Sequence, residues 1–192
     1  MIKRYDFSDG KWSMDDFFFC YSPLWKSRVE FLQEENSVTN NYGDGKPHYI
    51  SILTKEKYKT GVHLRAKCSF QAFGAPLIVI SDDVSLNENG EMHYGLHFEA
   101  VAWYKGLNVW RVVPCPEREV RPIHSTLIGS KTFTIENDAI VEIDMIVRKN
   151  ELYVGIDGHY ITIPHEEIPE SFHVGVTACE GFNRFYEFTI EE

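Results

Sequence analysis

Residues able to bind a metal ion or exchange protons gather in one stretch of the chain, HYGLHFEAVAWYKGLNVWRVVP, which runs from His93 to Pro114. Its beginning, HYGLH, has the spacing of a zinc-binding HxxxH pair, which needs a helix to bring the two histidines together. The alternating pattern that follows predicts a strand instead, and Gly95 disfavours a helix. On a strand, His93 and His97 lie about 13 Å apart, at ~3.3 Å per residue. They cannot share one ion, so we expect no metal site here.

His97 and Glu99 form the first candidate pair for function. Residues two apart point to the same face of a strand. These two side chains could hydrogen-bond one ligand, hold a small ion with further partners, or form only a polar pair at a sheet surface. The following strand carries Asn108 and Trp110 on one face and Arg111 on the other. Without a bulge, Trp110 and Arg111 cannot both face one groove, and the sequence leaves open which of them does.

Together these side chains have the chemistry of a carbohydrate site. Sugar hydroxyls need planar hydrogen-bond partners, and an aromatic ring offers a surface for the apolar face of a pyranose. The predicted carbohydrate-binding residues are therefore His97, Glu99, Asn108, Trp110 and Arg111. Glu99 and Asn108 would bind hydroxyls, and Trp110 would stack on the sugar ring unless it is buried in the core. Arg111 would meet a carboxylate if the sugar is a uronate.

The loop after Ile80 is a candidate calcium site. It carries oxygen-bearing side chains of the kind that a hard cation prefers, namely Asp82, Asp83, Asn87, Glu88, Asn89 and Glu91. The spacing is not that of an EF-hand, and a solvated acidic loop is the simpler interpretation, so calcium binding stays open. The sequence has no GxSxG elbow and no glycine-rich phosphate loop, which argues against serine-hydrolase chemistry and nucleotide binding.

The elements that must position these residues are strands. Alternation with period two and turn residues recur along the chain, as expected of an antiparallel sandwich or barrel. Residues 141–164 predict a three-stranded meander with reversals at 148–150 and at Asp157-Gly158. Residues 23–36 fit either a helix or a strand. Further strands are predicted within residues 49–73 (two strands joined near Thr60-Gly61), 75–83 (buried on both faces), 93–104, 107–113 and 172–192 (two strands).

Composition limits the partners and the setting. The 192-residue chain carries a formal charge of −10, and no Lys/Arg cluster relieves it, so nucleic acid is not expected as a partner. No apolar run approaches the ~18 residues of a membrane span, and no signal-peptide pattern opens the sequence. Four cysteines without a CxxC pair predict reduced thiols in a cytoplasmic protein. The length and the lack of a linker predict a single domain over residues 1–192.

Several of these segments resemble a known superfamily. The meander IVEIDMIVRKNELYVGIDGHYI, the closing CEGFNRFYEFTIEE and the opening YDFSDGKW are similar to strands of concanavalin A-like lectin and glucanase domains. With HFEAVAWYKGLNVWRVVP added, the chain most resembles the galectin-like YesU family of bacterial proteins. The resemblance implies an all-β jelly roll of two curved antiparallel sheets, in which the opening strand pairs with the closing strand. The concave face of such folds commonly binds glycans, and galectins do so with His, Asn, Arg, Trp and Glu at spacings that this sequence does not reproduce.

The same resemblance raises the question of glucanase chemistry. Glucanases of this superfamily carry a Glu-x-Asp-x-x-Glu strand whose two glutamates act as nucleophile and acid. The most similar stretch here is VEIDMIV, with Glu142 and Asp144, but Val147 stands where the second glutamate is needed. This strand therefore lacks an acid for the leaving oxygen, and we interpret its polar side as a solvated outer face.

Three hypotheses follow. The first, which we favour, is a cytoplasmic carbohydrate-binding protein that takes an oligosaccharide from plant or bacterial polysaccharide and needs neither a cofactor nor a catalytic residue. The second is a glycoside hydrolase or polysaccharide lyase that uses Glu99 or another carboxylate, with His97 as acid or base. The third is a protein whose partner is another chain, such as a second copy in a homodimer, with no small ligand.

Overall fold

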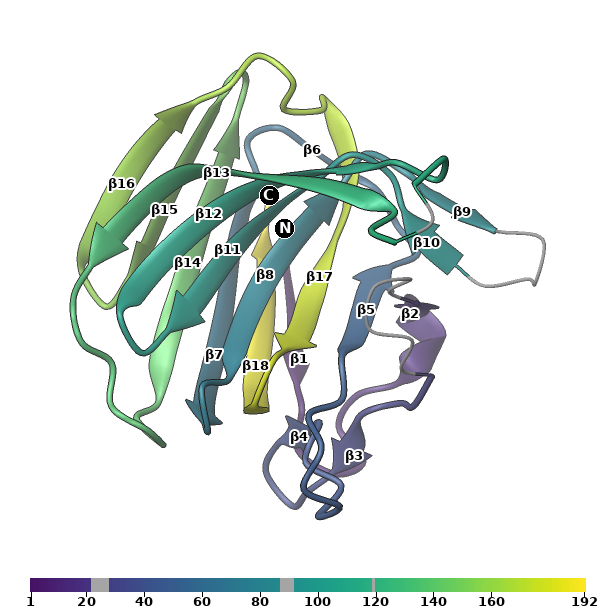
Figure 1. The fold of residues 1–192 in the computed structure, drawn as a ribbon, viewed down its shortest axis with the longest axis vertical. Coiled ribbons are helices and arrows are strands. Elements are labelled where there is room, and N and C mark those ends of the chain that lie inside the picture. The colour runs from purple at the N-terminus through teal and green to yellow at the C-terminus, as the bar shows by residue number, and fades with distance from the viewer. Residues whose placement is uncertain (22–27, 87–91, 119) are drawn as a thin grey trace.

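The computed structural model describes residues 1–21, 28–86, 92–118 and 120–192. In this part of the chain, two antiparallel β-sheets pack face to face around an apolar core, as Figure 1 shows. The helical content there is a single 3₁₀ turn, η1 (Met14–Asp16). None of the helices described could cross a membrane, because none is long and apolar enough. The predicted all-β, two-sheet antiparallel sandwich is confirmed.

Sheet A has eight strands and contains both the first and the last strand of the chain. Its main path runs, in spatial order, through β16 (His159–Pro164), β15 (Glu151–Ile156), β14 (Val141–Arg148), β7 (His63–Gln71), β18 (Phe182–Glu191), β4 (Val38–Thr39) and β3 (Leu32–Gln33). The remaining strand, β1 (Ile2–Asp6), pairs with β18. The expected pairing of the opening strand with the closing strand is therefore present.

Sheet B also has eight strands. Its main path runs through β13 (Ile123–Thr132), β12 (Gly106–Pro114), β11 (His97–Trp103), β8 (Ala75–Ser81), β17 (Ser171–Cys179), β5 (Ile50–Thr54) and β2 (Phe17–Cys20), and β6 (Tyr58–Lys59) pairs with β17. A separate two-stranded ribbon consists of β9 (Val84–Leu86) and β10 (Met92–Tyr94).

Alternation along the strands fills the space between the sheets. In β14, Val141, Ile143, Met145 and Val147 are buried in the core, and the residues between them face outwards. This burial is the physical reason for the period-two pattern, because one face of the strand is buried in the core and the other face stays in contact with solvent. β8 is buried along its whole length, which confirms the prediction of a strand covered on both faces.

The predicted meander is confirmed as β14, β15 and β16, which pair antiparallel in sequence order. Its two reversals use residues that accept a left-handed backbone, with Asn150 at φ 59°, Asp157 at φ 46° and Gly158 at φ 87°. Local turn chemistry therefore agrees with the strand pattern here.

The single strand predicted over residues 93–104 is wrong at its beginning. The chain is interrupted at Gly95, so that β10 pairs only with β9, and the strand of sheet B begins at His97. The Gly95 N–H donates to the carbonyl of Asp83 (2.9 Å). A Cβ atom on residue 95 would lie 2.0 Å from Oδ1 of Asp82, so any other residue here would have to displace that side chain.

Two predictions fall wholly or partly on residues outside the described part of the chain. Residues 22–27, in the segment that fitted either a helix or a strand, are among them; the described remainder of that segment contains β3 and no helix. Residues 87–91 of the candidate calcium loop also lie outside the described residues.

Candidate functional site

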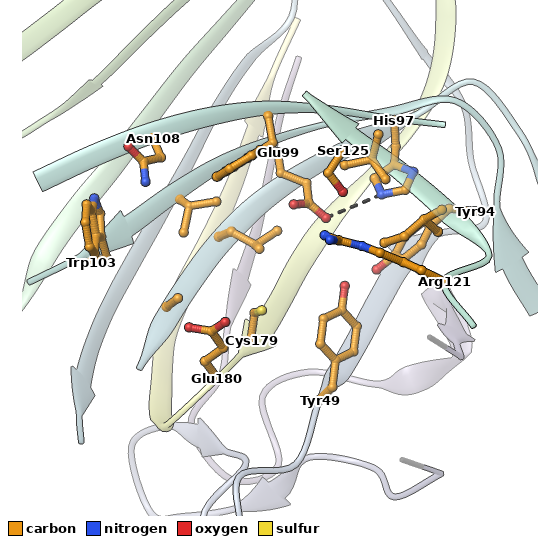
Figure 2. Close-up of a pocket in the computed structure, with 16 residues that line it drawn as sticks. Tyr49, Tyr94, His97, Glu99, Trp103, Asn108, Arg121, Ser125, Cys179 and Glu180 are labelled. Carbon is orange, nitrogen blue, oxygen red and sulfur yellow. Dashed lines mark ion pairs between the residues drawn. The ribbon is translucent and has the colours of Figure 1, made fainter. Parts of the chain in front are cut away.

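A pocket of about 430 Å³ opens on the face of sheet B that is turned away from the core (Figure 2). Its floor and walls come mainly from β8, β11, β12, β13 and the end of β17. Apolar side chains such as Leu77 and Val101 line it together with tryptophan rings and ionisable groups. A concave site with an apolar lining and a few convergent polar groups is the usual form of a small-molecule site.

Strand β11 supplies one side of the pocket through simple alternation. Phe98, Ala100 and Ala102 point into the core between the sheets. The residues between them lie on the opposite face, and His97, Glu99, Val101 and Trp103 all line the pocket. The structure therefore brings the predicted pair His97 and Glu99 to one face of one strand.

The structure of β12 shows which of two neighbouring residues, Trp110 or Arg111, faces the pocket. Asn108 and Trp110 line the pocket, next to Glu99 and its neighbours on β11. Arg111 lies on the other face of β12, where its Nε and Nη2 donate to the two carboxylate oxygens of Glu167 (2.5 and 2.6 Å). The irregularity in the β12–β13 ladder adds a residue at Ile128 of β13 rather than in β12. Alternation along β12 is thus uninterrupted, and Trp110 faces the pocket instead of Arg111.

The imidazole of His97 is held in one orientation. Its Nδ1 lies 2.9 Å from the carbonyl oxygen of Gly95, and because a carbonyl only accepts, Nδ1 carries the hydrogen. Nε2 is 3.4 Å from Oε1 of Glu99, and the ring packs against Tyr94 with centroids 4.5 Å apart. His97 is only 4% exposed. Nε2 and the carboxylate therefore face each other beside the pocket, where both can hydrogen-bond a ligand hydroxyl.

Two buried tyrosines, Tyr49 and Tyr94, line the pocket together with His97 and Glu99. The hydroxyl of Tyr94 lies 3.1 Å from Oγ1 of Thr177, which also contacts Oγ of Ser51 at 2.7 Å. Burial raises the pKa of Tyr49, and the neighbouring Tyr94 and Glu99 raise it further. Burial likewise raises the pKa of Tyr94. Both phenols therefore stay protonated at neutral pH and can donate hydrogen bonds, but neither is a base.

Cys179 lies in the pocket lining but is a poor candidate nucleophile. Burial raises the pKa of its thiol, and the carboxylates of Glu99 and Glu180 raise it further. The reactive form of cysteine is the thiolate, which this environment disfavours. All four cysteines of the chain are free thiols.

The opposite end of the pocket carries an indole and an amide. Asn108 and Trp103 lie near each other there (Figure 2). The indole Nε1 of Trp103 is buried and has no hydrogen-bond partner among the described residues. Because this nitrogen has almost no exposed surface, a ligand at this end of the pocket would meet the indole ring and the amide of Asn108 rather than the indole N–H.

The sequence did not point to four lining residues: Tyr49, Tyr94, Arg121 and Glu180. On a continuous strand Tyr94 would face away from His97 and Glu99, and the interruption at Gly95 brings its ring against His97 instead. Arg121 comes from the irregular segment between β12 and β13, and Figure 2 shows its guanidinium reaching into the pocket near Glu99 and Tyr49. Glycine at residue 95 was the one available signal for the break, whereas nothing in the sequence marks Arg121.

The alternative sites lie elsewhere. Glu142 and Asp144 are on β14 of sheet A, and Oδ1 of Asp144 is 2.5 Å from Nε2 of His63. Both therefore belong to the other sheet and lie outside the sheet B pocket, and Asp144 is engaged by His63. Among the described residues, no group of three or more His, Cys, Asp or Glu side chains is arranged to hold a metal ion.

No protein-family model matches the chain, and no curated protein sequence matches it significantly. Solved structures do match. A carbohydrate-binding module, CBM66 from Bacillus subtilis, has a TM-score of 0.56 and 9% identity, and the match covers 75% of this chain and 82% of that one. β-Agarase A in complex with oligoagarose has a TM-score of 0.65 and 9% identity, with 99% and 91% covered. The exoplasmic/lumenal domain of VIP36, bound to Ca²⁺ and Man3GlcNAc, has a TM-score of 0.61 and 13% identity, with 93% and 86% covered.

These neighbours share a concanavalin A-like jelly roll, and the present chain has that fold. At 9 to 13% identity the likeness extends to the arrangement of the strands. Function is a property of the site rather than of the scaffold, so it has to be argued from the residues of the pocket.

Proposed function

We propose that the pocket on sheet B binds a carbohydrate. One observation carries the proposal: a single cavity of about 430 Å³ brings the indole rings of Trp103 and Trp110 together with the polar groups of His97, Glu99 and Asn108. Indole rings offer flat apolar surfaces, and the carboxylate, amide and imidazole offer planar hydrogen-bonding groups between them. This is the combination that a pyranose, with one apolar face and a rim of hydroxyls, requires.

Each group has a specific role in the proposed complex. Glu99 accepts hydrogen bonds from two hydroxyls, and Nε2 of His97 accepts or donates beside it. At the other end of the pocket, Asn108 engages hydroxyls and the ring of Trp103 offers an apolar surface. Arg121 replaces Arg111 as the cation available to a carboxylated sugar, because Arg111 is already paired through two hydrogen bonds with Glu167.

Structural neighbours support an oligosaccharide as the class of ligand. One is named as a carbohydrate-binding module, and two were solved with oligoagarose and with Man3GlcNAc. We also propose that the chain works as one domain over residues 1–192 and is related to the galectin-like YesU family. The net charge of −10 supports a partner other than nucleic acid, and the four free thiols support a reducing, cytoplasmic setting.

A second function is favoured by the His97–Glu99 pair. A histidine with a fixed Nδ1 hydrogen and a carboxylate 3.4 Å from its Nε2 is suited to pass a proton to or from a substrate. In that case the protein would be a glycoside hydrolase or a polysaccharide lyase. The two functions differ in whether the bound oligosaccharide is recovered intact.

Calorimetric titration with neutral and uronate-containing oligosaccharides tests the proposal. We expect binding to the wild-type protein and a loss of roughly tenfold or more in affinity for His97→Ala, as for a lost hydrogen bond to a charged or polar partner. His63→Ala, on the outer face of sheet A, is the matched control and should bind normally. Chromatography of the recovered ligand distinguishes the two functions. Cleavage of the oligosaccharide that is abolished by His97→Ala would show that the protein is an enzyme rather than a binding protein. Absence of binding across the panel would contradict the proposal.

A further inference from the structure

An exposed aromatic cluster lies at the end of the pocket sheet, beyond the pocket itself. Phe73, in the turn between β7 and β8, is 70% exposed, and Tyr104, in the turn between β11 and β12, is 36% exposed. Their rings meet edge to face with centroids 5.4 Å apart. Tyr104 also packs edge to face on Trp103, at 5.0 Å. We call Phe73, Tyr104 and Trp103 the aromatic cluster.

The turn that carries Phe73 is strained. Ala72 and Phe73 have φ angles of 49° and 62°, and the Gly74 N–H donates to the Gln71 carbonyl (2.9 Å) across them. Two positive φ angles at the centre of such a turn are those of type I′, where Asn-Gly is preferred. A phenylalanine in the left-handed region is an outlier that costs free energy. Fold stability alone therefore does not account for an exposed phenylalanine at this position.

Trp103 joins the aromatic cluster to the pocket. It lines the pocket and touches Tyr104, so the pocket and the cluster form one continuous surface. From His97 to Trp103 the strand advances six residues, which is roughly 20 Å at ~3.3 Å per residue. A single sugar ring cannot span this length, whereas a linear oligosaccharide can.

Polar groups beside the cluster suit a sugar better than a protein partner. The ammonium of Lys105 lies 5.8 Å from the centre of the Trp103 ring and 5.2 Å from that of Tyr104. The ammonium lies over one face of each ring, so a sugar would stack on the remaining ring surface and could accept a hydrogen bond from the ammonium beside it. Three rings, one of them partly buried, offer far less area than the ~1,200 Å² or more that a stable protein interface buries.

We propose that the aromatic cluster is a second carbohydrate subsite, and that the ligand of this protein is an extended linear glycan rather than a mono- or disaccharide. The inference rests on the proposed function of the pocket. One part of the glycan lies at His97 and Glu99, the chain passes Trp103, and a later sugar ring stacks on Tyr104 and Phe73.

Affinity as a function of chain length tests this inference. The probes are ladders from disaccharide to octasaccharide of agarose, β-glucan, mannan, galactan and polygalacturonate, titrated into the full chain. For a ladder that binds, we expect affinity to rise with length. Phe73→Asn should lower octasaccharide affinity roughly three- to tenfold, the effect of losing one aromatic contact, and leave disaccharide affinity unchanged. Asparagine tolerates a left-handed backbone, so this variant should fold as well as the wild type.

Ala72→Asn is the matched control, because it relieves the same turn and keeps the ring of Phe73. It should retain the full gain of the octasaccharide over the disaccharide. Unchanged octasaccharide affinity in Phe73→Asn, or an equal loss in Ala72→Asn, would overturn the second subsite while leaving the pocket function in place. A shift of Phe73→Asn from dimer to monomer in sedimentation, with no change along the ladder, would overturn it in favour of self-association. If no ladder binds the wild-type protein, the proposed function fails and this inference fails with it.

Discussion

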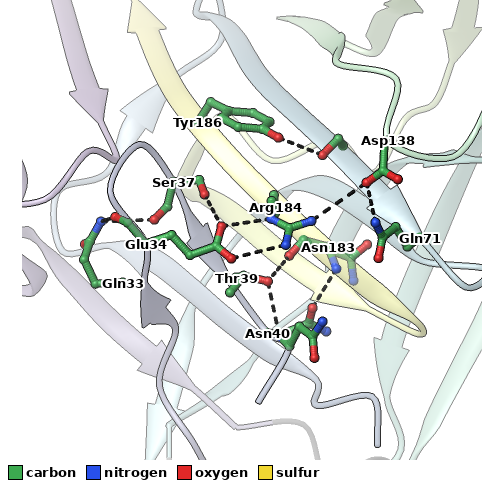
Figure 3. Close-up of polar contacts among 12 residues, drawn as sticks. Gln33, Glu34, Ser37, Thr39, Asn40, Gln71, Asp138, Asn183, Arg184 and Tyr186 are labelled. Atoms are coloured by element: carbon green, nitrogen blue, oxygen red, sulfur yellow. Dashed lines mark hydrogen bonds and ion pairs between the residues drawn. The ribbon is translucent and has the colours of Figure 1, made fainter. Parts of the chain in front are cut away.

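The outer face of sheet A and the pocket face of sheet B flank the same core, yet their polar side chains are used differently. On sheet A, charged groups pair with one another: Arg184 holds Glu34 through two hydrogen bonds (2.8 and 3.2 Å), as Figure 3 shows. On sheet B, His97 and Glu99 also pair, at 3.4 Å, but they do so in the lining of a pocket, together with Asn108 and two tryptophan rings. Polar groups that bond one another between chain segments stabilise the fold, whereas polar groups that converge on a cavity can also bond a ligand there.

The hydrogen bonds and ion pairs around Arg184 show how paired polar groups stabilise the fold. Glu34 also accepts from Oγ of Ser37 (2.6 Å), and Arg184 extends to Asp138 (3.9 Å). These contacts tie the segment before β4 and the segment before β14 to the closing strand β18. The network joins parts of the chain that are far apart in sequence, which is the role expected of a structural contact rather than of a binding site.

Substitution of Glu99 should have the largest effect and should fall on binding alone. Glu99→Gln keeps the shape of the side chain but removes the charge, and hydrogen bonds to charged groups contribute about 1.5–3 kcal/mol. We expect oligosaccharide affinity to fall by the equivalent factor, roughly tenfold to a hundredfold, with little change in the free energy of unfolding. Calorimetric titration and urea denaturation measure the two quantities.

Glu142→Gln makes the same chemical change on sheet A and serves as its control. Its binding affinity should equal that of the wild type, because β14 lies in the other sheet. If Glu99→Gln destabilised the protein strongly and left binding intact, the two faces would not differ in the way described here.

Substitution of Arg184 should have the opposite pattern, with a smaller effect: it should lower stability and leave sugar binding unchanged. Arg184→Leu leaves the Glu34 carboxylate, which is about one-third exposed, without its main partner. We expect the free energy of unfolding to fall by about 1–2 kcal/mol, as for a partly buried hydrogen-bonded pair, and sugar affinity to stay unchanged. A loss of binding without a loss of stability would place Arg184 in a functional site and contradict the comparison.

The same network predicts how stability depends on pH. Burial opposes ionisation of Glu34, but hydrogen bonds from Arg184 and Ser37 outweigh it, so the pKa of Glu34 lies below its ordinary value of 4.5. A lowered folded-state pKa means that the unfolded chain binds more protons in acid. The stability that this carboxylate contributes is therefore complete above its ordinary pKa and is lost as the pH falls through the lowered one.

We expect the stability difference between the wild type and Arg184→Leu to shrink as the pH falls from neutrality through the ordinary pKa of 4.5 and on through the lowered pKa of the folded state, where the carboxylate takes up a proton. Urea midpoints measured across this range provide the test. A difference that stays constant with pH would mean that the Arg184–Glu34 charge pair does not stabilise the fold.

Sequence patterns predicted the sheets and only part of the site, for reasons that differ between residues. His97 and Glu99 were placed together because alternation along a strand is a local property. Trp110 could not be separated from Arg111, because alternation places the two on opposite faces of β12, and tertiary packing decides which face lines the pocket; the bulge lies in β13 and leaves that alternation intact. Arg121 reaches the pocket through an irregular segment, and such placement is decided by tertiary packing that no local pattern encodes.

The smallest difference that we expect between structural positions and pocket positions concerns residues with a left-handed backbone. In the meander turn and before β14 such positions are occupied by tolerant residues, Asn150 and Asp138, whereas the connections between the two sheets place Ala72, Phe73 and Glu180 (φ 51°) in this conformation. Glu180 lines the pocket, so its position agrees with strain retained at a functional site. Glu180→Asn should relieve that strain and raise the free energy of unfolding by about 0.5–1 kcal/mol.

Asn150→Glu makes the opposite change in the meander turn and should lower the free energy of unfolding by about the same amount. Urea denaturation of the two variants gives both values, and titration with the longest bound oligosaccharide shows what Glu180 does for the ligand. Stabilisation of Glu180→Asn together with weaker binding would mean that the strained glutamate is kept for function. Stabilisation with unchanged binding would remove Glu180 from the site and restrict the ligand contacts to β11, β12 and Arg121.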